Sequence, residues 1–267
     1  MAFLRVDTAH LLPELRRSLV ALVGDLDDDS WRLPTVCPGW SVGDVAGHLL
    51  GVELANVSRR RDGHRVDPAP GEAPGPWLAA FNDDWVRAAR RLSPRVVAGM
   101  LDLAGSWFEQ HVAGLDLEAI GGTVWWVGPE PAPVWLDVAH EYTERWVHQQ
   151  QIRDATGVPG LRDARYVGPV VATFVHALPR SLAGAGATEG TTVDLSFTGE
   201  GGGEWHARRG PDGWSLQAGP SPSPACRLTG PVDAAWRLYA DYAGVTLAAA
   251  GDEALAAAAS RGRAIIA

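Results

Sequence analysis

Three side chains in the stretch 140–151 are of types that bind metal ions or move protons. They are His140, Glu144 and His148, spaced four residues apart. Prolines precede the stretch and Gly157 follows it, so we predict a single helix of about six turns. Residues four apart lie on the same helix face, and the three side chains therefore form one stripe. A single helix cannot close a metal site, so a further ligand must come from elsewhere in the chain.

A candidate for the missing ligand is His48, which lies in a largely apolar segment. The segment begins at Ser41, and Asp44 three residues later gives the spacing of a capping box, which predicts the start of a helix. Helix bundles build metal sites from side chains on facing helices. Two histidines and one carboxylate leave coordination positions open, as in catalytic zinc and non-haem iron sites. The alternative for His48 is a hydrogen-bonded core histidine, and spacing alone does not decide between them.

His140 extends the stripe by one turn and has several possible roles. It is a candidate ligand, a partner of a ligand or a catalytic general base, and the alternative is a rim histidine that faces solvent. The run from His140 to Glu144 differs from the His-Glu-x-x-His zinc protease motif at one residue, because Glu144 stands in place of the second His. We reject the protease interpretation.

Composition excludes several classes of partner. The chain has 267 residues and a net charge of −9, which argues against nucleic acid or an anionic membrane as partner. It contains no apolar run of about 18 residues, the length that a transmembrane helix needs. The first residues lack the pattern of a signal peptide, so we expect a cytoplasmic protein. The sequence leaves the oligomeric state open between monomer and homodimer.

The segment pattern predicts an α+β chain of two domains. Residues 1–183 are predicted to form a helical domain. Residues 184–267, which begin with a linker of small residues, are predicted to form a small α+β domain. Short alternating segments separated by turn signals predict an antiparallel sheet in the second domain. The expected helices are 7–24, 41–60, 76–92, 94–115, the stretch around 140–151, 162–183, 233–242 and 252–260, and the expected strands are 192–197, 205–208, 214–217 and 226–229.

Aromatic residues and cysteines supply further candidates. Trp125 and Trp126 fall in a segment expected to be extended, 123–127, just before the helix with the ligand stripe. They are either walls of the open face of a metal site or bundle core. Cys37 is a small packing residue or a nucleophile, and packing is favoured because no basic neighbour lowers its pKa. Cys226 alternates within a strand and is expected in the core.

Two motifs resemble a known family. Residues 31–49 read W-x-x-P-T-x-C-P-G-W-S-V-x-D-V-x-x-H-L, and residues 144–153 read E-R-W-V-H-Q-Q-x-I-R. Both resemble the actinobacterial mycothiol-dependent maleylpyruvate isomerase family, a branch of the DinB-like four-helix-bundle metalloproteins. The Gly-rich segment 199–205 and residues 208–216 resemble the small C-terminal domain of that family. The resemblance thus covers nearly the whole chain.

The resemblance implies a fold, a metal site and a reaction. It implies an N-terminal DinB-like four-helix bundle, in which His48, Glu144 and His148 hold a divalent metal. The metal usually assigned to the family is zinc, with nickel or iron as alternatives, and the second cofactor is mycothiol. The implied activity is that of a thiol S-transferase or cis-trans isomerase acting on a small electrophilic metabolite.

The chain also departs from the family pattern. Asp commonly follows the Gln-Gln pair, whereas this chain has Gln151, which could orient a ligand one turn away or make a structural hydrogen bond. The substrate-binding residues of the isomerase have no match here. From their charge, Arg208 or Arg209 of the C-terminal domain is our candidate to bind a substrate carboxylate, and Arg208 is our choice. A metal-dependent lyase or hydrolase that uses bound water stays open as an alternative. So does a non-catalytic ligand-binding protein.

Overall fold

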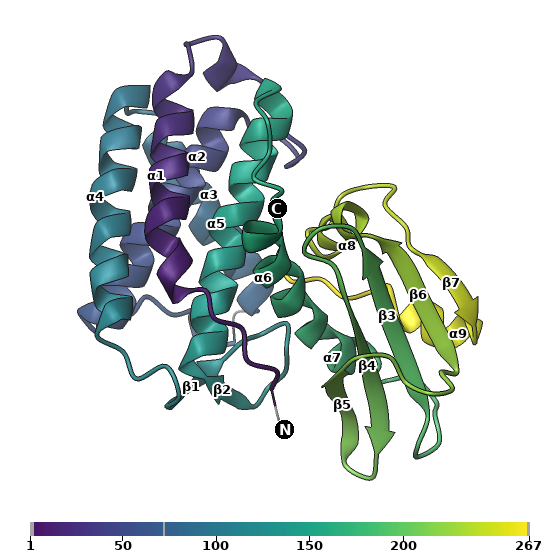
Figure 1. The fold of residues 1–267 in the computed structure, drawn as a ribbon. Helices are drawn as coiled ribbons and strands as arrows, with labels where there is room; N and C mark the ends of the chain where they lie inside the picture. The colour runs from purple at the N-terminus through teal and green to yellow at the C-terminus, as the bar shows by residue number, and fades with distance from the viewer. Residues whose placement is uncertain (1–2, 72, 266–267) are drawn as a thin grey trace. The chain divides into compact units, whose positions relative to one another are not determined.

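The computed structural model describes residues 3–71 and 73–265. The chain divides into two compact units, whose helices and strands are drawn in Figure 1. One unit consists of Ala9–Leu115 and Arg145–Gly160, and the other of Met1–Thr8, Asp116–Glu144 and Leu161–Ala267. The division falls within one long helix, so that helix belongs to both units. The domain boundary expected after residue 183 stays a prediction.

The first unit is a helical bundle, as predicted. α1 packs on α4, and α2 packs on both α3 and α4. Their shared core includes Leu19, Val45 and Leu101, and Ile152 joins it from the C-terminal part of α5. The helices are α1 (Leu12–Asp25), α2 (Val42–Asn56), α3 (Pro74–Ala89), α4 (Pro94–Ala113) and α5 (Val134–Thr156), with short helical turns at Ala9–Leu11, Ser30–Arg32 and Val57–Arg61.

The start of α2 follows from the capping box predicted at Ser41. The Asp44 backbone N–H donates to Ser41 Oγ at 3.2 Å, and the Ser41 N–H donates to Asp44 Oδ2 at 3.0 Å. Both bonds satisfy donors that the first turn of a helix leaves unpaired. The capping box therefore determines where α2 begins, and His48 lies about two turns after that start.

Two glycines of α2 determine how closely α3 approaches. A Cβ added at Gly47 would lie 2.6 Å from Ala89 Cβ, and one added at Gly51 would lie 2.6 Å from Trp85 Cβ. Real Cβ atoms do not come this close, so the packing of α2 on α3 requires residues without a side chain. The small neighbours of His48 thus serve the approach of a helix.

We expect Gly51→Ala to destabilise the bundle. Overpacking against Trp85 costs about 1–3 kcal/mol, which exceeds the roughly 0.5–1 kcal/mol that alanine gains over glycine within a helix. Gly99→Ala in α4 is the matched control, because a Cβ there meets nothing within 4 Å. Urea unfolding should show Gly99→Ala more stable than the wild type and Gly51→Ala less stable. Equal stabilisation of both variants would contradict the packing argument.

The second unit combines a sheet with short helices. Its five-stranded sheet has the order β5-β4-β3-β6-β7. The strands of this sheet are β3 (Thr192–Thr198), β4 (Gly203–Gly210), β5 (Gly213–Ala218), β6 (Cys226–Pro231) and β7 (Ala248–Gly251). The remaining elements are the hairpin β1 (Ile120–Thr123) and β2 (Pro131–Pro133), with α6 (Ala164–Phe174), a turn at Val175–Ala177, α7 (Leu178–Ser181), α8 (Val232–Tyr239) and α9 (Glu253–Ala259).

The α+β class is confirmed, but the sheet is not purely antiparallel. β3 pairs with β6 in parallel, while its other neighbour β4 is antiparallel. The strand β7 lies outside the four predicted ones and pairs with β6. Its sequence is Ala-Ala-Ala-Gly, which has no strand propensity of its own, so its pairing partner determines its conformation.

The predicted extended segment 123–127 is also wrong in part. β1 ends at Thr123, and residues 124–127 form a turn in which Val127 N–H donates to Val124 O at 2.9 Å. The predicted helix 162–183 is broken at Val175–Ala177.

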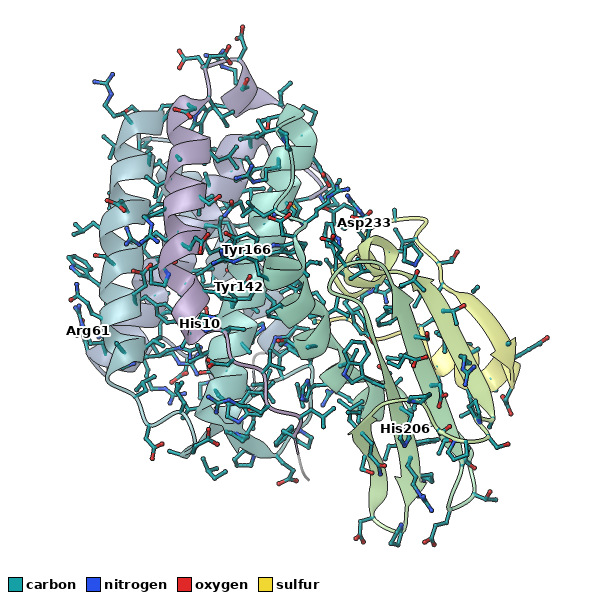
Figure 2. The ribbon with its side chains drawn as sticks, in the orientation of Figure 1. His10, Arg61, Tyr142, Tyr166, His206 and Asp233 are labelled. Carbon is teal, nitrogen blue, oxygen red and sulfur yellow. The ribbon has the colours of Figure 1, made fainter. Side chains whose placement is uncertain are left out.

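Within its unit, the N-terminal part of α5 is fixed to α6. Tyr142 Oη donates to the backbone carbonyl of Tyr166 at 3.0 Å, and both side chains are labelled in Figure 2. In the described part of the chain, no helix is both long enough and apolar enough to cross a membrane.

Candidate metal centre

The helix α5 buries polar side chains around much of its circumference. A helix of this kind is not oriented by one apolar stripe, so hydrogen bonds must fix its rotation. The buried polar residues are Glu141, Thr143, Arg145, His148, Gln149, Gln150, Gln151 and Arg153.

Partners on α1 and α2 hold the C-terminal part of α5. Arg145 makes a two-pronged ion pair with Glu53 of α2, Nε to Oε1 at 2.7 Å and Nη2 to Oε2 at 2.8 Å. Ser18 of α1 donates to Gln149 Oε1 at 2.9 Å and accepts from Arg153 Nη2, also at 2.9 Å. These bonds hold the C-terminal part of α5 against α1 and α2.

His48, Glu144 and His148 converge. Each offers one ligand atom, and these atoms lie within 4.8 Å of one another. Glu144 ends the segment Asp116–Glu144 of its unit, but the unbroken helix α5 carries it one turn before His148. The structure therefore brings together the three residues proposed from the sequence. It makes them neighbours although His48 lies about a hundred residues before His148 in the chain.

The environment of His48 favours its neutral form. The residue is 5% exposed, and its ring contacts those of Trp40 and His148, at centroid distances of 5.1 and 4.7 Å. Burial lowers the pKa of His48 well below its ordinary value, and the neighbouring His148 lowers it further. Among the described residues, His48 Nδ1 has no hydrogen-bond partner although it is buried. A neutral imidazole with a buried nitrogen left unbonded fits a metal ligand.

His148 is held in the tautomer that a metal requires. Its Nδ1 lies 2.7 Å from Oε1 of Gln151, and an amide oxygen can only accept. The ring proton is therefore on Nδ1, and Nε2 keeps its lone pair. Both residues are at most 1% exposed. Two imidazoles and one carboxylate fit the ligand set of a zinc ion with an open position.

The same amide oxygen accepts a second hydrogen bond, from Cys37. The Cys37 thiol lies 3.1 Å from Gln151 Oε1, and the side chain is 1% exposed. The prediction that Cys37 is a buried packing residue is confirmed, and so is the burial of Cys226 in β6. No local pattern indicates that Cys37 contacts a residue beside the histidine cluster, because 114 residues separate it from Gln151.

His140 contacts Glu144 on one side and Trp126 on the other. Trp126 Nε1 donates to His140 Nδ1 at 3.0 Å, so that nitrogen carries no proton. His140 Nε2 lies 3.8 Å from Glu144 Oε1, and the His140 side chain is 14% exposed. His140 is therefore packed beside Glu144 and partly exposed, and its role stays a prediction.

The two tryptophans of the turn before α5 differ in environment. Trp126 is 1% exposed and packs against Phe174 as well as His140. Trp125 next to it is 44% exposed. Arg208 is exposed on β4, opposite Thr192 of β3 and Ser215 of β5. Binding roles for Trp125, Trp126 and Arg208 stay predictions.

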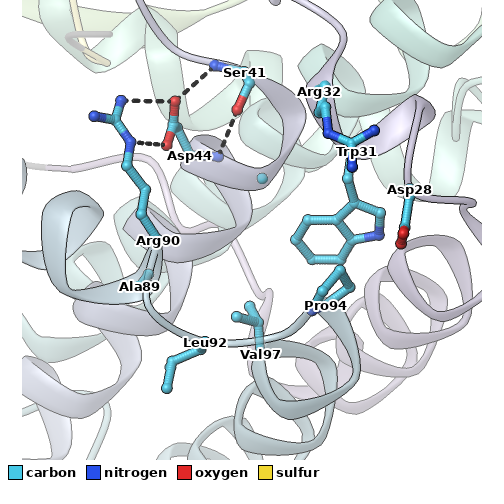
Figure 3. A pocket seen from close by; sticks show the side chains of 11 residues that line it. Asp28, Trp31, Arg32, Ser41, Asp44, Ala89, Arg90, Leu92, Pro94 and Val97 are labelled. Atoms are coloured by element: carbon cyan, nitrogen blue, oxygen red, sulfur yellow. Dashed lines mark hydrogen bonds and ion pairs between the residues drawn. The ribbon is translucent and has the colours of Figure 1, made fainter.

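A separate pocket of about 320 Å³ lies at the N-terminus of α2 and contains none of the three clustered residues. Figure 3 shows its lining, in which Arg90 and the Ser41 N–H both bind the Asp44 carboxylate. Arg90 Nε lies 2.8 Å from Asp44 Oδ1. Since the helix cap and Arg90 already satisfy this carboxylate, we assign it a structural role.

Comparison with known families gives these residues a context. The model of the mycothiol maleylpyruvate isomerase N-terminal domain matches residues 12–153. The chain belongs to this family. The match includes His48, Glu144 and His148, together with Gln151 and Cys37.

Two curated mycobacterial relatives in this comparison carry no assigned function. They are the uncharacterized proteins Rv0036c of Mycobacterium tuberculosis strain ATCC 25618 / H37Rv and MT0041 of strain CDC 1551 / Oshkosh. Each is 29% identical over 142 residues, which is 52% of this chain and 52% of the relative. The chain thus aligns with about half the length of these relatives.

Solved structures of the family share the fold over most of the chain. The crystal structure of the mycothiol-dependent maleylpyruvate isomerase matches with a TM-score of 0.55 at 12% identity, over 94% of this chain and 96% of the other. A histidine-to-alanine mutant of that enzyme matches with a TM-score of 0.52 at 11% identity, over the same shares of the two chains. At such low identity the likeness supports the fold, and chemistry must be argued from the residues of this chain.

Proposed function

We propose that this chain is a metal-dependent enzyme that adds the sulfur of mycothiol to a small electrophilic molecule. The observation that carries the proposal is the convergence of His48, Glu144 and His148 in a member of this family. These residues would hold one divalent metal, zinc first, with nickel or iron as alternatives. A divalent metal bound there lowers the pKa of a coordinated thiol and so supplies a thiolate near neutral pH.

The neighbouring side chains prepare the three ligands. Gln151 fixes the tautomer of His148, and burial keeps His48 neutral. We propose that His140 orients the Glu144 carboxylate or transfers a proton beside it, with Trp126 holding the His140 ring. Trp125 and Trp126 are proposed as walls of the thiol and substrate site. Arg208 is proposed to bind a substrate carboxylate.

Two outcomes of the addition are possible. The thiolate sulfur forms a bond to an electrophilic carbon, and a conjugated double bond becomes a single bond. Release of the S-conjugate after protonation makes the protein a transferase. Rotation about that single bond, followed by loss of the same thiol, restores the double bond in the other geometry and makes it an isomerase. The solved relatives are maleylpyruvate isomerases, so we propose a maleylpyruvate-like unsaturated keto acid as the first substrate to test.

The partners in the proposed reaction are therefore a small electrophile and a low-molecular-weight thiol. We propose a cytoplasmic location and no nucleic-acid or membrane partner, in line with the acidic net charge. Monomer and homodimer remain the two oligomeric states to distinguish by size measurement.

The zinc-loaded protein is expected to turn over only when mycothiol is present. The zinc-loaded protein would be incubated with mycothiol and maleylpyruvate or, in a separate reaction, with mycothiol and a chlorinated nitroarene. Isomerised acid would be followed by absorbance and S-conjugate by mass spectrometry. We expect the reaction to need both mycothiol and the metal, because sulfur becomes a strong nucleophile near pH 7 only as the thiolate. The metal-free protein and Glu144→Gln serve as controls and should be inactive.

Three results would redirect the proposal. Turnover without any thiol would favour a lyase or hydrolase that uses bound water. Zinc binding with no reaction of either electrophile would favour a ligand-binding protein. Equal turnover by the metal-free protein would reject the metal site as the source of activity.

A further inference from the structure

We propose that Gln151 is a positioning residue for His148, and that its neutral amide leaves the metal centre able to accept one anionic thiolate. The inference rests on the proposed function, because it assumes that His148 binds a metal. It adds a role for two residues outside the ligand set, Gln151 and Cys37.

Two donors converge on one oxygen. Gln151 Oε1 accepts from His148 Nδ1 at 2.7 Å and from Cys37 Sγ at 3.1 Å. The three residues are at most 1% exposed, so water does not compete for these bonds. A ring N–H that donates to an oxygen is the usual way in which proteins orient a metal-binding histidine.

The orientation of the amide has a consequence for His148. With its oxygen toward the ring, Nδ1 holds the proton and Nε2 can bind a metal. With its nitrogen toward the ring, Nδ1 would accept, the proton would move to Nε2, and the metal-binding lone pair would be lost. The Cys37 thiol favours the first orientation because its S–H also needs an acceptor.

The other end of the amide supports a functional role. Gln151 Nε2 is buried and has no hydrogen-bond partner among the described residues. An unsatisfied buried amide group costs free energy, and natural proteins keep few of them. An apolar residue of similar size would avoid this cost but could not accept from His148. The cost is consistent with a position selected for its acceptor oxygen.

Charge distinguishes glutamine from a carboxylate in this position. A carboxylate could accept the same bonds, but it would add a negative charge to a buried site. The centre as built has one carboxylate, Glu144, and two neutral imidazoles. A divalent ion would therefore retain one positive charge, which a single thiolate neutralises. Buried charges are costly unless they are paired, so the neutral amide favours binding of an anionic ligand.

Two substitutions at one position test this assignment. Gln151→Met keeps the length of the side chain but loses the oxygen, and Gln151→Glu keeps the acceptor and adds a charge. Zinc affinity would be measured by competition with a chromophoric chelator. Mycothiol affinity would be measured on the cobalt-loaded protein from the sulfur-to-cobalt charge-transfer absorption.

We expect the two variants to separate. Gln151→Met should weaken zinc binding by about 10–100-fold, the usual effect of losing a partner of a metal-binding histidine. Gln151→Glu should bind zinc more tightly than the wild type and bind mycothiol at least about 10-fold more weakly, because its extra charge opposes the thiolate. A purely structural role would not move the two affinities in opposite directions.

Gln149→Met is the matched control, since Gln149 is a buried glutamine of the same helix that bonds Ser18 and Leu15 of α1. It should lose folding stability but keep the zinc and mycothiol affinities of the wild type.

Cys37→Ser, which keeps a donor, should weaken zinc binding less than Cys37→Ala. If Gln151→Met does not fold, Gln151→Glu carries the test. Variants at position 151 with unchanged affinities would overturn the inference, whereas a wild type that binds no zinc would overturn the proposed function itself.

Discussion

Replacing His48 and His148 together with alanine is expected to abolish stoichiometric zinc binding. The two imidazoles supply two of the three ligands, and a lone carboxylate does not retain zinc in competition with a chelator. Metal analysis after dialysis should fall from about one equivalent in the wild type to below about a tenth in the double variant. Saturating zinc at about 100 times its Kd should stabilise the wild type by about 2.7 kcal/mol and leave the double variant unchanged.

His176→Ala is the control for the loss of a buried imidazole. His176 is 2% exposed, lies outside the cluster, and bonds the backbone carbonyl of Thr173 through Nδ1. Its removal should lower the free energy of unfolding but leave zinc content intact. Circular dichroism would verify that the double variant keeps its helices. A folded double variant that still binds one zinc would disprove the assignment of the site.

The sequence predicts some residues of this site better than others. The spacing of His140, Glu144 and His148 follows from helix geometry, and the structure places all three on α5. The partner histidine does not follow from spacing, because a contact between segments about a hundred residues apart depends on how whole helices pack. His48 was one candidate from its place in a predicted helix, and the family motif favoured it. The resemblance separates Glu144 and His148 from His140, and the structure adds that Trp126 donates to His140.

Local signals predicted the helices better than the sheet. The capping box at Ser41 acts over three residues, and α2 begins where it predicts. The parallel pair of β3 and β6 depends on a chain crossing past β4 and β5, which alternation of side chains does not encode. β7 consists of alanine and glycine, and only its register with β6 makes it a strand.

The hydrogen bonds beside the metal candidates were the least predictable feature. Gln151 was expected to orient a ligand or to make a structural hydrogen bond, and its Oε1 lies 2.7 Å from His148 Nδ1. The hydrogen bond from Cys37 to Gln151 Oε1 joins a loop to α5, and no sequence periodicity predicts it.

The second large effect expected is on stability, from Arg145→Met. Arg145 and Glu53 are 5% and 6% exposed, and Arg145 also stacks over the Phe108 ring at 4.3 Å. Removing one member of a buried ion pair leaves the other charge without compensation, which costs about 3–5 kcal/mol. Methionine keeps the length and apolar contacts of the arginine stem, so the loss should report the charge. Urea unfolding of the metal-free protein would measure it.

Two further variants determine whether this loss comes from an uncompensated buried charge. Arg145→Met combined with Glu53→Leu removes both charges, and it should recover most of the stability, because apolar replacements of buried pairs are often neutral or stabilising. Arg87→Met breaks a pair with Asp84 in which both side chains are more than half exposed, and it should change stability by less than about 1 kcal/mol. If Arg145→Met and Arg87→Met lost the same amount, the Glu53–Arg145 pair would not be what fixes α5 against α2. A double variant as unstable as the single one would instead assign the loss to packing over Phe108.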